Sequence, residues 1–194
     1  MKVSVSGATP SVDLTAVTNF DTIQLVDGDT AVASTMTVAL KNGNATYTSA
    51  SSYQTITVDA SAFVKDIATI DASGELDAKV IIKGGSAADV ITLSASSNFG
   101  DSITGAAGND TFTAAGNLTS ADTVDGGDGT DTITATGTVG DTAFTKVTSI
   151  ETLKSAGSTF SATLGAKALA AGITSVDLTN AGADVVTIST GFTG

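Results

Sequence analysis

Residues 126–134 read GGDGTDTIT, a glycine-rich turn followed by an aspartate and a short β-branched segment. Two related copies precede this one, GAAGNDTFT at 105–113 and GGSAADVIT at 84–92. The copies begin at 84, 105 and 126, so the pattern has a period of 21 residues. A fixed period of this size indicates a solenoid, in which each repeat forms one coil.

Two weaker copies divide the period, at 96–104 and 117–125. The aspartates of the strong and weak copies follow one another at alternating intervals of 12 and 9 residues. Each coil therefore has two unequal halves, and we expect the strong loops to stack on one edge of the solenoid and the weak loops on the other. The aspartates concerned are Asp89, Asp101, Asp110, Asp122 and Asp131, and Asp141 is expected to begin the next weak-edge loop.

The segments after these aspartates carry a β-strand pattern. An apolar side chain stands two residues after each strong aspartate (Ile91, Phe112, Ile133) and after each weak one (Ile103, Val124). Side chains alternate between the faces of a strand, so stacked coils would line these residues into two facing apolar ladders. The sequence predicts an all-β fold, a right-handed parallel β-roll or β-helix solenoid with coils of about 21 residues, flanked by an additional β-rich segment.

The composition narrows the possible chemistry. The chain has 194 residues, a net charge of −12, and no histidine, cysteine or tryptophan. Disulfides, Ser-His or Cys-His catalysis and the usual zinc sites are therefore excluded. The negative charge argues against nucleic acid as a partner, and no apolar stretch is long enough for a membrane-spanning helix. The carboxylate pair Glu75 and Asp77 is interpreted as an exposed, solvated turn, and we expect a protein that is not an enzyme.

The loops themselves suggest a cation site. Glycine permits positive φ values and leaves carbonyl oxygens accessible. Aspartates stacked about 5 Å apart repel one another unless a cation lies between them, and an all-oxygen ligand set suits calcium. We expect two sites, one between the loops of Asp89 and Asp110 and one between those of Asp110 and Asp131. The alternative is a set of solvated Gly-Asp turns without metal, and metal binding at the weak edge is left open.

The candidate metal ligands come from the three strong loops. They are Gly84, Ser86, Ala88 and Asp89 in the first loop, Gly105, Ala107, Asn109 and Asp110 in the second, and Gly126, Asp128, Thr130 and Asp131 in the third.

The repeat resembles the calcium-binding nonapeptide of RTX proteins, G-G-x-G-x-D-x-U-x, in which U is a large apolar residue. The copy at 126–134 matches throughout, while the two earlier copies depart at Ala106 and Ala87. More broadly, the chain resembles the calcium-binding part of bacterial surface-layer (S-layer) proteins in its Thr/Ala/Gly-rich strands and its segments at 58–61 and 150–153. The resemblance implies Ca²⁺ as the bound cation.

The resemblance also implies a role. It suggests a structural, calcium-stabilised and self-assembling component of the bacterial cell surface, extracellular and exported by type I secretion, with cell-surface polysaccharide as a further partner. A non-catalytic RTX domain of a type I-secreted adhesin or hydrolase is the alternative. Ice binding by the threonines of the stacked strands is a second, weaker alternative. The first residues lack the apolar run of a signal peptide, which is compatible with this route of export and with a fragment of a longer chain.

We expect three parts in the chain: a β-rich segment at 1–83, the calcium-binding β-roll at 84–145, and a continuation of the solenoid or the start of a further module at 146–194. The pair Asn42-Gly43 predicts an antiparallel hairpin between strands at 35–40 and 45–48. Alanines at 163–171 predict a two-turn helix before Gly172. Further strands are expected at 3–6, 22–26, 53–58, 67–70, 79–82, 175–179 and 184–189.

Overall fold

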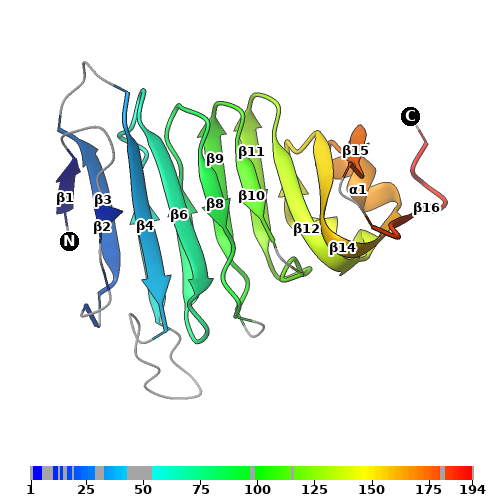
Figure 1. Cartoon of the computed structure of the whole chain (residues 1–194), viewed down its shortest axis with the longest axis horizontal. Helices are drawn as coiled ribbons and strands as arrows, with labels where there is room; N and C mark the ends of the chain where they lie inside the picture. Colours follow the sequence, from blue (N-terminus) through cyan, green and yellow to red (C-terminus); the bar gives the residue numbers. More distant parts are fainter. Residues whose placement is uncertain are drawn as a thin grey trace.

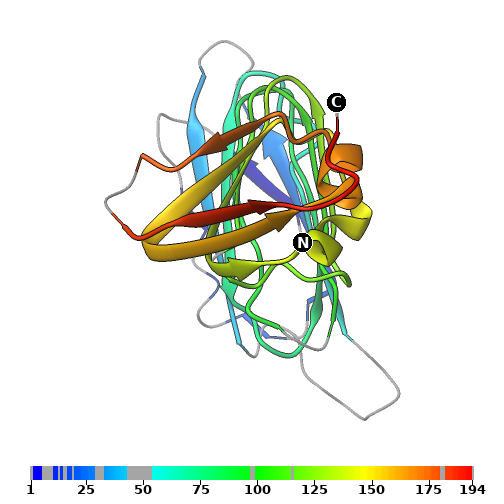
Figure 2. The ribbon, with the colours of Figure 1, turned by 90° about the vertical axis from the view of Figure 1, so that its right-hand side faces the viewer.

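The computed structural model describes residues 2–5, 11–12, 14, 17–18, 20–28, 33–42, 54–96, 99–114, 116–179 and 182–193. Parallel strands stack in about seven turns and form a β-solenoid, which confirms the predicted all-β fold. The stack is elongated, with the first strands at one end and the last strands at the other (Figure 1). A view along the long axis shows the coils superposed as two layers joined at two edges (Figure 2).

Consecutive strands alternate between two sheets, and every strand pairing among the described residues is parallel. Sheet A has seven strands: β1 (Lys2–Val5), β3 (Thr22–Asp27), β5 (Thr55–Asp59), β7 (Lys79–Lys83), β9 (Ser102–Ala107), β11 (Thr123–Asp128) and β13 (Val147–Thr148). Sheet B has nine: β2 (Ser11–Val12), β4 (Thr35–Lys41), β6 (Ile67–Gly74), β8 (Val90–Thr92), β10 (Thr111–Thr113), β12 (Thr132–Val139), β14 (Thr152–Leu164), β15 (Ser175–Asp177) and β16 (Val185–Ile188).

The chain turns at two edges of the solenoid. We call the edge where it passes from sheet A to sheet B the AB corner; it contains residues 84–89, 108–110 and 129–131. The opposite edge, the BA corner, contains residues 75–78, 93–96, 99–101, 114, 116–122 and 140–146. The strong repeat loops lie at the AB corner and the weak ones at the BA corner, as the 12- and 9-residue spacing predicted.

The core is built from the two predicted apolar ladders. Phe112 pairs in register with Ile91 on one side and Ile133 on the other, and all three are buried. Ile103 and Val124 pair in the same way in sheet A and are also buried. Because buried and more exposed residues alternate along β12 and its neighbours, each strand contributes one face to the space between the sheets. The 21-residue period therefore keeps like residues above one another.

The solenoid already includes the strands before residue 84. β4 pairs in parallel with β2 on one edge and with β6 on the other, so the antiparallel pairing predicted for the strand at 35–40 is wrong for the residues described. The expected return strand at 45–48 lies outside them. The Asn-Gly turn signal describes only local geometry, whereas both edges of β4 are occupied by neighbouring coils. Both sheets run without interruption past residues 84 and 145.

Two short helices cover part of the BA corner near the C-terminal end (Figure 2). The 3₁₀ helix η1 (Asp141–Lys146) forms the corner where the next weak-edge loop was expected. The predicted alanine-rich helix is confirmed as α1 (Ala166–Ala171), and it ends at Gly172 with φ of 104°. It begins later than expected because β14 continues to Leu164. Oδ1 of Asp141 accepts hydrogen bonds from the backbone N–H groups of Gly165 and Ala168, which joins the two helices.

Candidate metal centre

Three buried aspartates form a ladder along the AB corner. Asp89, Asp110 and Asp131 are at most 1% exposed, and each directly precedes a strand of sheet B. Asp110 Oδ1 accepts the backbone N–H of Asp89 at 2.7 Å, and Asp131 Oδ1 accepts that of Asp110 at the same distance. Each carboxylate therefore binds the backbone of the coil before it, and the ladder joins successive coils.

The ladder extends beyond the repeats found in the sequence. Asp66 Oδ1 accepts the N–H of Ser34 at 2.7 Å, and Glu151 Oε2 accepts that of Asp131 at 2.7 Å. Both carboxylates fall outside the 21-residue spacing, since Asp66 lies 23 residues before Asp89 and Glu151 lies 20 residues after Asp131. The sequence signal that could have identified them is their position directly before a β-branched strand.

Two carboxylate oxygens in the ladder have no partner. Oδ2 of Asp110 and Oδ2 of Asp131 are buried without a hydrogen bond. Oδ2 of Asp89 differs, because it accepts the N–H of Gly85 at 2.7 Å. The second and third strong loops therefore each hold one lone oxygen, and the first holds none.

Oxygen atoms of neighbouring coils converge beside the glycines of these loops. A Cβ atom added to Gly105 would collide with Asp110 Oδ2 and with the carbonyl oxygen of Gly126 on the next coil. A Cβ on Gly126 would collide in the same way with Asp131 Oδ2 and the carbonyl oxygen of Ser149. Each lone carboxylate oxygen thus lies close to a carbonyl oxygen of the following coil, in space that only glycine leaves open.

The second and third loops share a backbone conformation that the first lacks. Gly127 and Gly129 have φ values of 100° and 141°, and Ala106 and Gly108 have values of 84° and 116°. Residues 84–89, all of which the structure describes, have no positive φ. Ala106 stands where the nonapeptide pattern expects glycine and still adopts the left-handed conformation.

We expect Ala106→Gly to raise the free energy of unfolding by about 0.5–1 kcal/mol. The left-handed conformation is costly for alanine, and this gain outweighs the extra freedom of glycine in the unfolded chain. Chemical denaturation would measure the change. Ala107→Gly is the matched control, since Ala107 has no positive φ, and it should lower the free energy by a similar amount. Equal effects of the two substitutions would contradict the argument.

Burial and like charges disfavour the ionised form of the ladder carboxylates. Burial raises the pKa of Asp110 to about 7, and the charges of Asp89 and Asp131 add to the effect, while the hydrogen bond from the Asp89 N–H opposes it. The pKa values of Asp89 and Asp131 are also raised, mainly by burial. Near neutral pH these groups therefore favour a proton or a cation as a partner.

In calcium-free buffer, stability is expected to fall as the pH rises from 5 to 8. Folded Asp110 retains a proton that an unfolded aspartate loses near pH 3.9, so its contribution to stability is complete below that pH and is lost as the pH passes about 7. Urea unfolding at pH 5, 6.5 and 8 in chelator would measure it. Asp110→Asn should show a smaller decline, and a midpoint that rises over this range would contradict the prediction.

The two weak-loop aspartates at the BA corner, Asp101 and Asp122, are fully hydrogen-bonded by the protein. Asp101 accepts from both the N–H and the hydroxyl of Ser94, at 2.8 and 2.9 Å. Asp122 accepts the N–H of Asp101 at 2.8 Å with one oxygen and the N–H of Thr119 at 2.7 Å with the other. Burial, with the Asp122 charge as a smaller contribution, raises the pKa of Asp101 to about 6. The protein itself supplies partners for all four oxygens.

The interpretation of Glu75 and Asp77 as an exposed, solvated turn is wrong for Glu75, while Asp77 is half-buried. Glu75 is fully buried at the BA corner, directly after β6. Its Oε1 atom accepts the backbone N–H groups of Leu76 and Asp77, each at 3.1 Å. These bonds turn the side chain back beneath the loop, which sequence spacing alone does not reveal.

The remaining candidate ligands at the AB corner differ in how far they are exposed to solvent. Gly84, Gly105 and Gly126 are buried, Ala107 is half-buried, and the exposed ones are Ser86, Ala88, Asn109, Asp128 and Thr130. The side-chain oxygen of Asn109 accepts the N–H of Thr130 at 2.9 Å, so it joins two loops.

The donor set at the AB corner fits a hard cation. No three His, Cys, Asp or Glu side chains within the described parts of the chain form a group that could hold a metal ion. A cation here would therefore take one lone carboxylate oxygen, from Asp110 or Asp131, and draw its other protein ligands from backbone carbonyl groups. Calcium accepts such mixed oxygen ligands with flexible geometry, so the residues present fit it.

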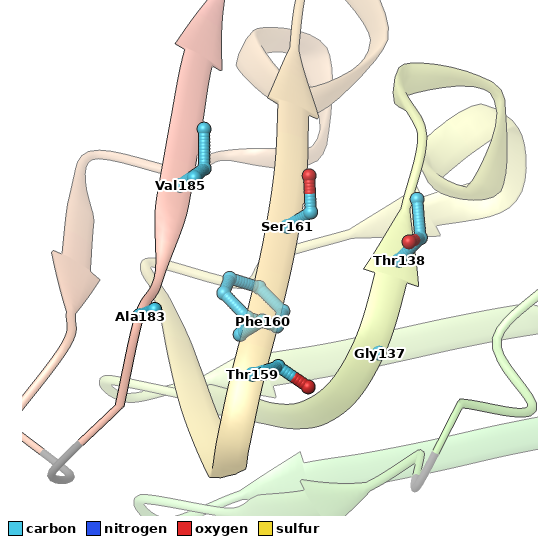
Figure 3. Close-up of a pocket in the computed structure, with 7 residues that line it drawn as sticks. All are labelled: Gly137, Thr138, Thr159, Phe160, Ser161, Ala183 and Val185. Atoms are coloured by element: carbon cyan, nitrogen blue, oxygen red, sulfur yellow. The ribbon is translucent and has the colours of Figure 1, made fainter.

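A pocket of about 160 Å³ lies at the C-terminal end, away from these loops. Figure 3 shows it at the bend of β14, between β12 and β16. Its lining is apolar or hydroxyl-bearing and includes no ionisable group: Gly137, Thr138, Thr159, Phe160, Ser161, Ala183 and Val185.

The fold and the AB corner together define a parallel β-solenoid with an internal ladder of buried carboxylates. Comparisons with protein-family models, with curated proteins and with solved structures find no significant match. Within the described residues, no helix is long and apolar enough to cross a membrane.

Proposed function

We propose that this chain is a calcium-stabilised structural module of a bacterial cell-surface layer, without a catalytic role. The observation that supports calcium is the pair of lone, buried carboxylate oxygens on Asp110 and Asp131, in consecutive loops of one conformation. A buried carboxylate oxygen without a partner is costly, and a cation removes that cost together with the repulsion along the ladder.

The proposal assigns one ion to each of these two loops. Asp110 Oδ2 and the carbonyl oxygen of Gly126 would contribute to the first, and Asp131 Oδ2 and the carbonyl oxygen of Ser149 to the second. Asp89 would stay a purely structural residue, because backbone N–H groups occupy both of its oxygens. Calcium would supply positive charge between coils and hold them together.

Calcium would then act as a folding switch. In a calcium-poor cytosol the ladder stays uncompensated and the coils are weakly held, which suits export by type I secretion. Outside the cell, sites with dissociation constants of about 10⁻⁴–10⁻³ M, typical of extracellular modules, fill with calcium and stabilise the folded state. The extracellular location and the secretion route depend on the resemblance to RTX and S-layer proteins.

Assembly into a layer is supported by the C-terminal end of the solenoid. β15 and β16 each pair with β14, and in the described part of the chain neither has a partner on its other edge. Val185 and Ile188 of β16 are 55% and 57% exposed. Open strand edges with exposed apolar side chains favour pairing with another chain, here a further copy of this one. Cell-surface polysaccharide remains a second proposed partner.

A calcium titration followed by light scattering would test the proposal. We expect particle growth as calcium rises through about 10⁻⁴–10⁻³ M, reversed by chelator. Asp110→Asn should shift the response to higher calcium, whereas Asp21→Asn, which neutralises an exposed carboxylate, should not. A chain that binds calcium and stays monomeric would favour the alternative, a non-catalytic RTX domain of a secreted adhesin or hydrolase. If the chain binds no calcium, the proposal of a calcium-stabilised module is refuted.

A further inference from the structure

The turn after β6 buries a second group of oxygen atoms, at the BA corner. Oε2 of Glu75, Oδ1 of Asp77 and Oγ of Ser96 are all buried, and none has a hydrogen-bond partner. Glu75 is fully buried and Ser96 is 8% exposed. None of these atoms belongs to the strong repeat loops at 84–92, 105–113 and 126–134, and Ser96 is the first residue of the weak copy at 96–104.

The three side chains come from two adjacent coils. Ser96 lies 21 residues after Glu75, which is the offset that pairs Ile70 with Ile91 in the strands just before them. The N–H of Ala95 donates to the carbonyl oxygen of Glu75 at 3.2 Å, so the segment before Ser96 lies directly against the turn. The carboxyl group of Asp77 lies close enough to that of Glu75 for its charge to disfavour the ionised form of Glu75.

We propose that Glu75, Asp77 and Ser96 form a further binding site for a hard divalent cation such as calcium, separate from the AB corner. The backbone N–H groups of Leu76 and Asp77 hold one oxygen of Glu75 and leave the other free. The same division occurs in Asp110 and Asp131, where one oxygen binds the backbone and the other has no partner.

The charge in this turn is not compensated by the protein. The two ion pairs found among the described residues are Lys83–Asp59 and Lys154–Asp177, and neither involves this turn. Burial, with the Asp77 carboxyl as a smaller contribution, raises the pKa of Glu75 to about 7. A lone proton shared between the two carboxyl groups would satisfy two of the three oxygens, whereas a cation satisfies all three.

The turn lies at the surface, although its three lone oxygens are buried. Asp77 is half-buried and Leu76 is 48% exposed, so a small opening of the turn would admit the ion and the water molecules that complete its coordination. The inference does not depend on the proposed function, because the loops of Asp110 and Asp131 contribute no atom to this site.

Native mass spectrometry and calorimetry of the whole chain with calcium chloride would test the inference. We expect Glu75→Gln and Asp77→Asn each to bind one calcium ion fewer than the unmodified chain, and Asp21→Asn to bind the same number. Ser96→Ala should weaken the same ion about tenfold, since it removes one ligand. The double variant Asp110→Asn/Asp131→Asn should keep this ion and lose those of the AB corner.

An unchanged number of ions in both Glu75→Gln and Asp77→Asn would overturn the site and favour a shared proton. If Glu75→Gln does not fold, Asp77→Asn and Ser96→Ala carry the same test, because both leave the buried Glu75 in place. If the double variant retains every ion, the assignment at the AB corner fails and this site stands. If the turn variants keep every ion while the double variant loses its ions, the site at Glu75 fails and the assignment at the AB corner stands.

Discussion

Calcium is expected to raise the unfolding midpoint of this protein by about 10–20 °C. An ion that binds only the folded state contributes about 2.7 kcal/mol at a concentration 100 times its dissociation constant, so two ions at the AB corner contribute about 5 kcal/mol. Each kcal/mol shifts the midpoint of a chain of this length by about 2–4 °C. Thermal unfolding followed by circular dichroism, with saturating calcium and with chelator, would measure the shift.

The size of the shift should depend on Asp110. In Asp110→Asn the side-chain oxygen can still accept the N–H of Asp89, and the charge between Asp89 and Asp131 is removed. We therefore expect this variant to be about as stable as the unmodified chain in chelator, and its gain from calcium to be smaller by the contribution of one ion, about 2.7 kcal/mol. Asp21→Asn is the control and should gain the full amount. Identical midpoints with calcium and with chelator would refute the calcium assignment.

Gly126→Ala is expected to destabilise the protein by about 3 kcal/mol, whether calcium is present or not. The new Cβ would collide with the carbonyl oxygen of Ser149, which is backbone of the next coil, and with the side chain of Asp131. Overpacking against backbone that cannot move aside costs about 1–3 kcal/mol. The value expected here is at the upper end of that range, because the added Cβ collides with both the backbone of Ser149 and the side chain of Asp131. The midpoint should fall by about 6–12 °C, as thermal unfolding would show.

Gly140→Ala provides the matched control for this substitution. Gly140 has φ of −86°, and the nearest atom to an added Cβ is the hydroxyl of Thr142 at 3.8 Å. The same chemical change should therefore leave stability unchanged or slightly raised, because alanine restricts the unfolded chain. Similar losses in the two variants would mean that close stacking at the AB corner is not what requires glycine.

The periodic parts of the sequence predicted the solenoid well. The 21-residue interval identified the stacking, and the apolar residues two positions after each aspartate identified the core, as the register of Phe112 with Ile91 and Ile133 confirms. Both features repeat, and a repeated residue has the same surroundings in each coil. The helix before Gly172 was also predictable, since it depends on local propensity and a local end signal.

Features that depend on contacts between irregular segments were not predictable. The pairing of β4 with β2 and β6 connects coils whose spacing departs from 21 residues, so the sequence shows no repeat there. Burial of Glu75 depends on a side chain that turns back onto its own backbone. The difference between Asp89 and Asp110 likewise depends on whether the backbone of the same loop donates to the second oxygen. Gly85 does so for Asp89 and no residue does so for Asp110, although the two aspartates look alike in the repeat.

The parallel register also bears on how quickly the chain finds its structure. In the central coils each strand pairs with residues about 21 positions away, roughly a tenth of the 194-residue chain. Such a low relative contact order, about 0.1, is more typical of fast-folding helical bundles than of β-sandwiches. Nucleation therefore requires only two adjacent coils, and growth proceeds one coil at a time in either direction. Folding of one pair of coils therefore does not have to wait until the rest of the chain is in place.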